Sequence, residues 1–345
     1  MLSVNEIAEI QSKGKSYKIG NTTIIRIPTK AYTSNCLSSR GLYKTLEDIA
    51  PNAILHHNIN PTTMIIASRY ASKYQIPILC DSHVDEINVS KNKLWFIAYY
   101  KVLVRLATLF CRNNITKFYG VTPSRCDFIE KYYKVPKDKI ALLPIGADTE
   151  SSNKIEIKER LRAKYAYNIS DFIIISGGKM GQYKGTNNLI EAVDSIRKKY
   201  ETLNVKLILF GSFEDNFTKE IAEGKDFIDI YGWCDRKKSL ELLKLSDIAC
   251  WPIHHTTLIE DAISVNTPIV TRKTRTTCHL IDGNGFWLNN GDTYEIELSL
   301  EKLLSKTSSQ MKELKEACDK KKEVISYLTI AKTIINDINS TTKKW

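Results

Sequence analysis

Glycines and two lysines separate an apolar strand from a helix near the middle of the chain. The segment runs from Gly177 to Gly185, and it places Lys179 and Lys184 five residues apart. Glycine lets a backbone approach an anion closely, and the free N–H groups of a first helical turn carry partial positive charge. Lysines add point charges that can reach the same anion from two sides. The P-loop spacing GxxxxGK[ST] is absent, so the pattern predicts another kind of phosphate site, with an ordinary strand-to-helix loop as the alternative.

The flanking elements must hold this segment in place. Residues 172–176 form a β-branched run typical of a buried strand, and residues 187–199 carry apolar side chains on one helical face. Strands alternate with helices on both sides of a polar, lysine- and glutamate-rich stretch that ends near residue 165 and marks the predicted hinge. This rhythm favours parallel sheets with right-handed crossovers. We therefore predict an α/β protein with two Rossmann-like domains that face each other across a cleft, with ligands beyond the carboxyl ends of the strands.

The predicted boundaries follow from the same pattern. Residues 1–150 would form the acceptor-side domain, shortened at its start, residues 151–320 the donor-binding domain, and residues 321–345 a helix that packs back toward the first domain. The predicted strands are 22–27, 53–58, 76–80, 118–122, 140–143, 172–176, 205–210, 227–231, 248–251 and 268–271. The predicted helices are 62–74, 92–116, 125–133, 187–199, 237–245, 257–265 and a helical tail from 308.

Composition narrows the functional class. The formal net charge of +11 suggests an anionic partner, namely nucleic acid, a membrane surface or a phosphorylated ligand. No nucleic-acid-binding motif accompanies that charge, so we predict no nucleic-acid partner. The eight cysteines are scattered without a CxxC pair, which indicates a reducing cytosol with neither disulfides nor a zinc site. No run of 18 apolar residues exists, so we predict no transmembrane helix.

The predicted helix 92–116 combines apolar and basic residues. Its centre reads LWFIAYYKVLVRLATLF, and Lys101, Arg105 and Arg112 fall at i, i+4 and i+11, which places them on one helical face. This is the pattern of a helix that lies in the plane of an anionic membrane surface. A core helix with a narrow solvated face fits equally well. Both interpretations stay open at the level of sequence.

Further segments form a pattern with the lysine pair. They are Asp261-Ala262 with Pro268-Ile269-Val270, the hinge segment Leu143-Pro144-Ile145-Gly146-Ala147-Asp148, and the strand ends Gly211 and Gly232-Trp233. In this order and spacing, residues 40–340 resemble the retaining glycosyltransferases of family 4, the glycosyl transferases group 1. The resemblance implies the two-domain GT-B fold and a nucleotide-sugar donor. It also implies transfer with retention of configuration, without a bound metal or other cofactor.

The resemblance assigns roles to single residues. It implies that Gly178, Lys179 and Lys184 hold the donor's diphosphate, and that Asp261 binds ribose hydroxyls. Gly211 and Trp233 would lie where the family's backbone meets the nucleobase. The predicted donor-binding set also includes the imidazole, hydroxyl and carboxyl groups of a nearby loop and helix start, namely His255, Thr256, Thr257 and Glu260.

The chain departs from the family pattern at several positions. Lys179 replaces an arginine, Ile145 replaces an asparagine, and the first of two glutamates eight residues apart is absent, because a shorter loop of residues 252–257 takes its place. Residues 1–30 also lack the family's opening strand, glycine-rich loop and helix. An incomplete acceptor site would follow from that difference.

The catalytic prediction combines the lysine pair with a histidine. Lys179 and Lys184 would stabilise the leaving diphosphate, which requires no metal. His83 follows the predicted strand 76–80, in the region where the family has a histidine near the donor sugar. We predict that it orients the sugar or assists transfer, with a structural loop histidine as the alternative. Asp85 and Glu86 are candidates for holding the acceptor hydroxyl.

The predicted function is a glycosyltransferase at the cytosolic face of the cell membrane. Its partners would be a nucleotide-sugar donor and a surface polysaccharide or lipid-linked glycan as acceptor, with peripheral membrane contact through residues 92–116. The alternative is a non-catalytic GT-B module that binds a nucleotide sugar or a partner glycosyltransferase. Release of nucleoside diphosphate from nucleotide sugars distinguishes the two.

Overall fold

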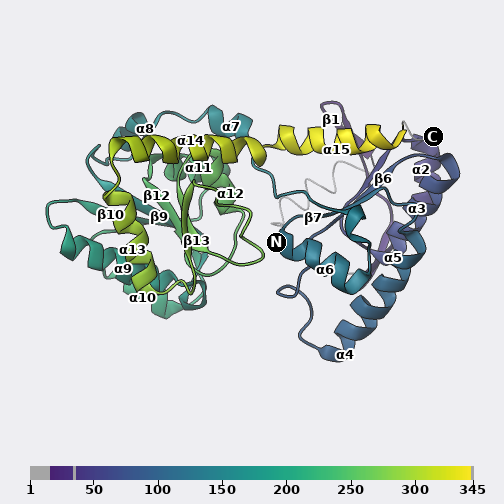
Figure 1. The fold of residues 1–345 in the computed structure, drawn as a ribbon, viewed down its shortest axis with the longest axis horizontal. Helices are drawn as coiled ribbons and strands as arrows, with labels where there is room; N and C mark the ends of the chain where they lie inside the picture. The colour runs from purple at the N-terminus through teal and green to yellow at the C-terminus, as the bar shows by residue number, and fades with distance from the viewer. Residues whose placement is uncertain (1–15, 34–35, 343–345) are drawn as a thin grey trace. The chain divides into compact units, whose positions relative to one another are not determined.

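The computed structural model describes residues 16–33 and 36–342 of the chain (Figure 1). They form two compact units. The first unit holds the described residues up to Gly120, then Arg125–Ala141 and the described residues from Asn336 onward. The second holds Val121–Ser124 and Leu142–Ile335. The last helix, α15 (Tyr327–Thr342), therefore contributes residues to both units.

The second unit is built on a parallel sheet of six strands. The strands are β9 (Phe172–Met180), β10 (Val205–Phe213), β11 (Ile228–Gly232), β12 (Ile248–Trp251), β13 (Ile269–Arg272) and β14 (Gly285–Leu288). Their order across the sheet is β11-β10-β9-β12-β13-β14, and each neighbouring pair runs parallel. This is the doubly wound Rossmann order 3-2-1-4-5-6. The order reverses between β9 and β12, where such sheets bind their ligands.

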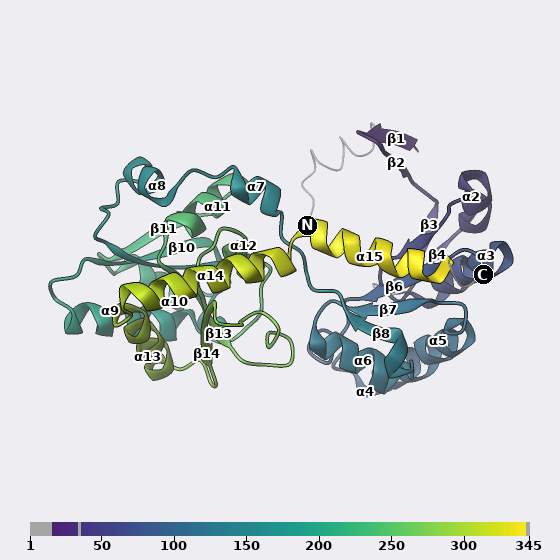
Figure 2. The same cartoon turned by 45° about the horizontal axis from the view of Figure 1, so that its top comes forward.

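Helices cover both faces of this sheet because its central strand is apolar on both sides. Ile174 packs into a core with α9 (Thr186–Lys199), α10 (Asn216–Glu223) and α13 (Thr293–Leu304). Its neighbours Ile173 and Ile175 point to the opposite core, with α8 (Lys158–Lys164), α11 (Arg236–Leu245) and α12 (Leu258–Ser264). Figure 2 shows the sheet between these layers, with α14 (Ser308–Val324) beside them. The predicted α/β fold of this half is confirmed.

Strand β9 continues through the glycines that were predicted to form a turn. Residues 177–180 pair in register with residues 210–213 of β10. A Cβ on Gly177 would lie 2.3 Å from the Phe210 ring, and a Cβ on Gly211, whose φ is +114°, would lie 2.1 Å from the carbonyl oxygen of Gly178. Close packing of the two strands thus requires these glycines. The turn itself is confined to Gly181–Gly185, with a 3₁₀ turn at Gln182–Lys184.

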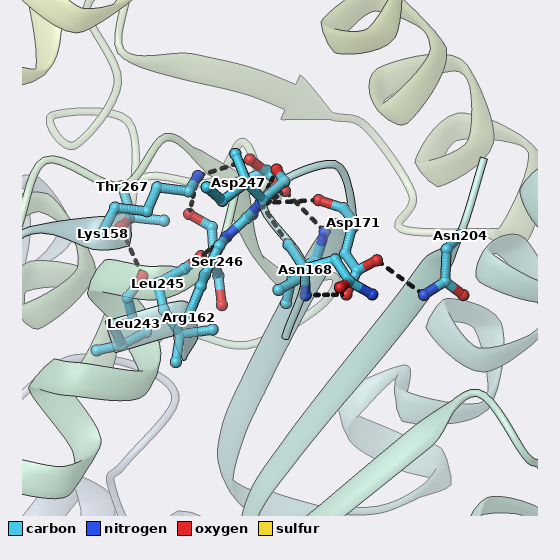
Figure 3. A network of polar contacts seen from close by, with 12 residues as sticks. Lys158, Arg162, Asn168, Asp171, Asn204, Leu243, Leu245, Ser246, Asp247 and Thr267 are labelled. Carbon is cyan, nitrogen blue, oxygen red and sulfur yellow. Dashed lines mark hydrogen bonds and ion pairs between the residues drawn. The ribbon is translucent and has the colours of Figure 1, made fainter. Parts of the chain in front are cut away.

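A polar network joins the amino ends of the strands in the second unit (Figure 3). The guanidinium of Arg162 is 3% exposed and donates to the carbonyl oxygens of Leu245 at 3.0 Å and Asp171 at 3.0 Å. It also donates to Oδ2 of Asp247 at 2.7 Å. Lys158 donates to the other oxygen of that carboxylate at 2.6 Å. This network ties α8 to the loops that precede β9 and β12.

The first unit contains a four-stranded sheet with the order β5-β6-β7-β8. These strands are β5 (Ile54–His56), β6 (Ile78–Ser82), β7 (Lys117–Gly120) and β8 (Ile140–Leu142). Pairing is parallel from β5 to β6 and from β6 to β7. Helices α3 (Pro61–Tyr74) and α6 (Pro123–Tyr133) contribute to its core. Two hairpins precede the sheet in sequence, β1–β2 (Ser16–Ile19, Thr22–Ile25) and β3–β4 (Thr29–Thr33, Cys36–Ser39), followed by α2 (Leu42–Ile49).

The predicted helix 92–116 forms as three consecutive segments, and its middle is wider than an α-helix. They are α4 (Lys93–Phe96), a π-helix η1 (Ile97–Val104) and α5 (Arg105–Cys111). Two of the three cations predicted to share a helical face make contacts within the first unit. Lys101 lies over the rings of Phe96 and Tyr132, and Arg112 donates to the carbonyl oxygen of Lys134.

The exposed face of this helix is apolar. Leu94 is 81% exposed, Leu106 60% and Phe110 61%, whereas Tyr99, Tyr100 and Val104 pack into the core of the unit. Lys93–Cys111 is long and apolar enough to cross a membrane, judged by length and composition alone. However, 33% of its most apolar stretch is buried inside the protein. Its buried tyrosines make it a surface helix of a folded domain.

Candidate functional site

A cavity of about 140 Å³ opens at the carboxyl ends of β9 and β12, where the strand order reverses. It is lined by Ser176, Gly177, Lys179, Met180, Lys184, Thr186, Trp251, Pro252, His254, His255 and Thr256. The indole Nε1 of Trp251 donates to the carbonyl oxygen of Gly177 at 3.0 Å, which ties β12 to β9 beside the cavity. The sheet therefore brings together four predicted residues, Lys179, Lys184, His255 and Thr256, at the position where a doubly wound fold binds ligands.

The two lysines differ in their surroundings. Lys179 is exposed and lies 3.3 Å from Oε1 of Glu214, whose other carboxylate oxygen accepts a hydrogen bond from Tyr183. This hydroxyl and Lys179 together hold the pKa of Glu214 below its usual value. Lys184 has no carboxylate within ion-pair distance among the described residues, and its ammonium group lies over the Tyr183 ring. Lys184 is therefore available to an anion.

Burial and neighbouring charges determine the protonation of the ionisable side chains that line this cavity. Burial lowers the pKa of Lys184, Glu214 opposes that shift, and the positive charge of Lys179 adds to it. An anion between the two lysines would relieve this repulsion. Burial also lowers the pKa of His254, and Lys184 and Arg272 lower it further. His254 is therefore neutral at pH 7, and it can donate one hydrogen bond but adds no positive charge.

A buried carboxylate contacts His255 in the loop of residues 252–257. Glu260 is 1% exposed, and its Oε1 lies 2.8 Å from Nε2 of His255. The other oxygen, Oε2, is buried without a hydrogen-bond partner in the described structure. Glu260 therefore fixes the ring of His255 beside the cavity. It acts as a support for the predicted binding residue, not as a lining group.

One carboxylate oxygen of Asp261 already has a hydrogen-bond partner within the protein. Its Oδ2 accepts a hydrogen bond from Arg236 at 2.8 Å, and 8% of the residue is exposed. Arg236 was not predicted, because nothing in the spacing of residues 25 positions apart indicates contact. It leaves one oxygen of Asp261 for a ligand hydroxyl.

Other predicted donor residues do not line the cavity. Gly178 has a φ of +96°, Gly211 is required for the close approach of β10 to β9, and Trp233 is 83% exposed beyond the end of β11. Thr257 precedes α12 and makes no side-chain cap. Conversely, the prediction missed Ser176, Thr186 and Trp251, which line the cavity, and Glu214, which pairs with Lys179. The position of these residues at the ends of strands or at a helix start was the available signal.

His83 lies in the first unit, directly after β6. Its Nε2 is 3.7 Å from Oδ2 of Asp81, and its ring packs edge-on against that of His57. The two acceptor candidates beside it are already paired. Asp85 lies 3.7 Å from Arg125, and Glu86 accepts hydrogen bonds from Lys131 and Tyr132.

Comparisons with known proteins give the family of one domain and the fold of the chain. Residues 157–323 match the model of the glycosyl transferases group 1. A glycosyltransferase from Rickettsia africae is 14% identical with a TM-score of 0.70, over 99% of this chain and 89% of that chain. Sucrose-phosphate synthase from Thermosynechococcus elongatus is 13% identical with a TM-score of 0.66, over 96% and 86% of the two chains. Anabaena HepE in complex with UDP and glucose is 15% identical with a TM-score of 0.62, over 88% and 82%.

No curated protein matches the chain. At these low identities the solved structures show the fold, and the family model describes the unit that contains the lysine cavity. Both agree with the α/β fold described above. The chain has the GT-B fold, and its residues 157–323 form a glycosyltransferase domain of the glycosyl transferases group 1 family.

Proposed function

We propose that this enzyme transfers a sugar, with retention of configuration, from a nucleotide-sugar donor to a growing surface polysaccharide or lipid-linked glycan. The observation that carries the proposal is the lysine cavity at the switch point of the second sheet. Lys184 has no counter-ion among the described residues, and Lys179 lies beside it. Two cations in a partly buried cavity match a diphosphate in charge.

The same groups account for the chemistry. As the bond between sugar and diphosphate breaks, negative charge grows on the leaving oxygen, and cations fixed before the reaction stabilise it. Lys179 and Lys184 supply that charge, so we propose that the donor's diphosphate is held without a metal ion or other cofactor. The neutral His254 and the supported His255 would donate hydrogen bonds to the phosphate or sugar oxygens. The ribose would reach the free oxygen of Asp261.

The remaining assignments follow the family resemblance. In this proposal, Trp233 offers an exposed ring to the nucleobase, and stacking on such a ring contributes about 1–3 kcal/mol. Thr256 and Thr257 offer hydroxyls to the diphosphate. His83, in the first unit, orients the donor sugar or assists transfer.

The cytosolic face of a membrane is the proposed place of action. The apolar face of residues 93–111 carries Leu94, Leu106 and Phe110, and the chain has a formal net charge of +11. Apolar side chains that enter the headgroup region and a positive protein charge both favour an anionic bilayer. Flotation with phosphatidylglycerol liposomes should recover the protein, and replacing these three side chains with serine should abolish recovery. Equal flotation of the variant would contradict membrane contact.

A panel of nucleotide sugars tests the function. UDP-glucose comes first, because an Anabaena HepE structure was solved with that compound. We expect release of free nucleoside diphosphate with one member of the panel, and NMR of the sugar product should show the anomeric configuration of the donor. Absence of nucleoside diphosphate release with every donor, with and without added glycan acceptors, would contradict the proposal. An inverted product would contradict retention alone.

A further inference from the structure

Two histidines and an aspartate meet at the carboxyl edge of the first unit's sheet. His57 directly follows β5, Asp81 lies in β6, and His83 follows β6. Because β5 and β6 are parallel neighbours, their carboxyl ends lie side by side. This cluster belongs to the first unit, whereas the lysine cavity belongs to the second.

Both imidazoles face the same carboxylate oxygen. Nδ1 of His57 lies 2.8 Å from Oδ2 of Asp81, and Nε2 of His83 lies 3.7 Å from it. The three atoms are all within 4.8 Å of one another. In a tetrahedral site with metal–ligand bonds of about 2.1 Å, ligand atoms stand about 3.4 Å apart. The two measured distances bracket that spacing, so a cation needs only small side-chain movements to bind all three atoms.

The surrounding contacts hold these groups from behind. The backbone N–H of Asn58 donates to the second oxygen of the aspartate. The carbonyl oxygen of His83 accepts hydrogen bonds from Asn88 at 2.7 Å and from Arg125 at 2.9 Å. Asp85, 3.7 Å from Arg125, opposes the positive charge of that guanidinium. Such outer contacts orient metal ligands.

We propose that His57, Asp81 and His83 bind a divalent transition-metal cation such as Zn²⁺. Two imidazole nitrogens and one carboxylate oxygen suit this class, whereas Mg²⁺ and Ca²⁺ take oxygen ligands. On binding, the proton of His57 Nδ1 moves to Nε2, and the cation replaces the hydrogen bond to Asp81. The side chains of His57 and His83 are 74% and 42% exposed, so the remaining coordination positions face solvent.

This proposal departs from the sequence-based expectation of no metal. That expectation rested on the scattered cysteines and on the two lysines that would hold the diphosphate, and neither bears on histidines 26 residues apart. A bound cation would occupy Nε2 of His83. The part proposed for His83 in sugar transfer would then be exerted through the cation.

Calorimetry of the full chain with Zn²⁺ tests the site. We expect one Zn²⁺ per chain, and visible absorption of a Co²⁺ complex in a coordination number below six. His57→Ala, Asp81→Asn and His83→Ala should each weaken binding by at least about 100-fold, more than the loss of an outer contact costs. His57 is mostly exposed, so its variant should fold even where Asp81→Asn does not. Mg²⁺ in excess should not displace Zn²⁺.

A histidine of the second unit provides the control. His254→Asn should bind Zn²⁺ like the wild type. Absence of Zn²⁺ binding to the wild type, or equal binding by His57→Ala and His83→Ala, would overturn the proposal. UDP binding by the metal-free protein separates this result from the proposed function, because the lysine cavity does not require the cation.

Discussion

In the sheet of the second unit, charged side chains are paired at the amino edge, whereas some at the carboxyl edge remain unpaired within the described part of the chain. At the amino edge, Arg162 is buried and donates to backbone carbonyls and to Asp247, which Lys158 also contacts. At the carboxyl edge, Lys184 has no counter-ion among the described residues, and one oxygen of Glu260 is buried without a partner. Buried polar groups in folded proteins are nearly always paired. The amino edge follows that rule, and the carboxyl edge departs from it.

This difference assigns the amino edge of the sheet to the stability of the fold and the carboxyl edge to ligand binding. A paired network stabilises the fold because removing one member leaves the others desolvated and unpaired. Cations that repel each other in a cavity cost stability until an anion arrives. We therefore expect substitutions at the amino edge to change the free energy of unfolding, and substitutions at the carboxyl edge to change donor binding and turnover.

The largest expected effect is at the amino edge. Arg162→Ala should lower the free energy of unfolding by about 3–5 kcal/mol, because Asp247 and the carbonyl oxygens lose a buried donor. Urea denaturation measures this change. Arg160→Ala, on the exposed face of the same helix, should stay within about 0.5 kcal/mol of the wild type. Equal stabilities of the two variants would remove the structural role assigned to the network.

Lys184→Ala tests the carboxyl edge. Donor consumption should fall by a factor of about 100 or more, the scale of losing one group that stabilises a leaving oxyanion, with little change in unfolding. Lys198→Ala, an exposed position of α9, should turn over donor like the wild type. If Lys184→Ala retained full turnover, the diphosphate would not bind between the two lysines.

A smaller effect is expected behind the cavity. Glu260→Gln keeps the shape of the side chain but removes its charge, so the bond to His255 loses its charge-assisted component. We expect UDP to bind about tenfold more weakly, equivalent to about 1.4 kcal/mol. Calorimetric titration with UDP measures the change, with Glu223→Gln, whose side chain is exposed at the end of α10, as control. Unchanged affinity would show that His255 does not depend on Glu260.

The pH dependence of UDP binding should give the smallest change. Lys184 binds an anion in its charged form, and burial lowers its pKa from the ordinary value of 10.5. Affinity is therefore fully present below the lowered pKa and is lost as pH rises through it. UDP titrations at alkaline pH should show a several-fold loss that begins below the range of an exposed lysine. The Lys184→Ala variant should lack this loss, and its persistence there would assign it to another group.

Prediction from sequence succeeded where local patterns were strong. Residues 248–251 were predicted as a strand and form β12, because four consecutive apolar residues follow the polar pair Ser246-Asp247 and precede a proline. The prediction failed where a partner strand or a helix distortion decided the outcome. The glycines of β9 have low strand propensity, yet they pair with β10 because only glycine permits the close approach at Gly211 and Gly178. The sequence pattern also did not predict the π-helix of residues 97–104 inside the helix predicted over 92–116.

The candidate site shows the same division. The lysine pair lies within one local segment of six residues, so the sequence by itself determined that two cations would flank one anion position. The same local reasoning determined the alternation of strands and helices that leads to the GT-B fold. Only the tertiary structure decided which residues support or oppose those cations. Glu214 reaches Lys179 from β10's end, and Arg236 reaches Asp261 from α11, because the parallel strand order joins segments that are distant in sequence.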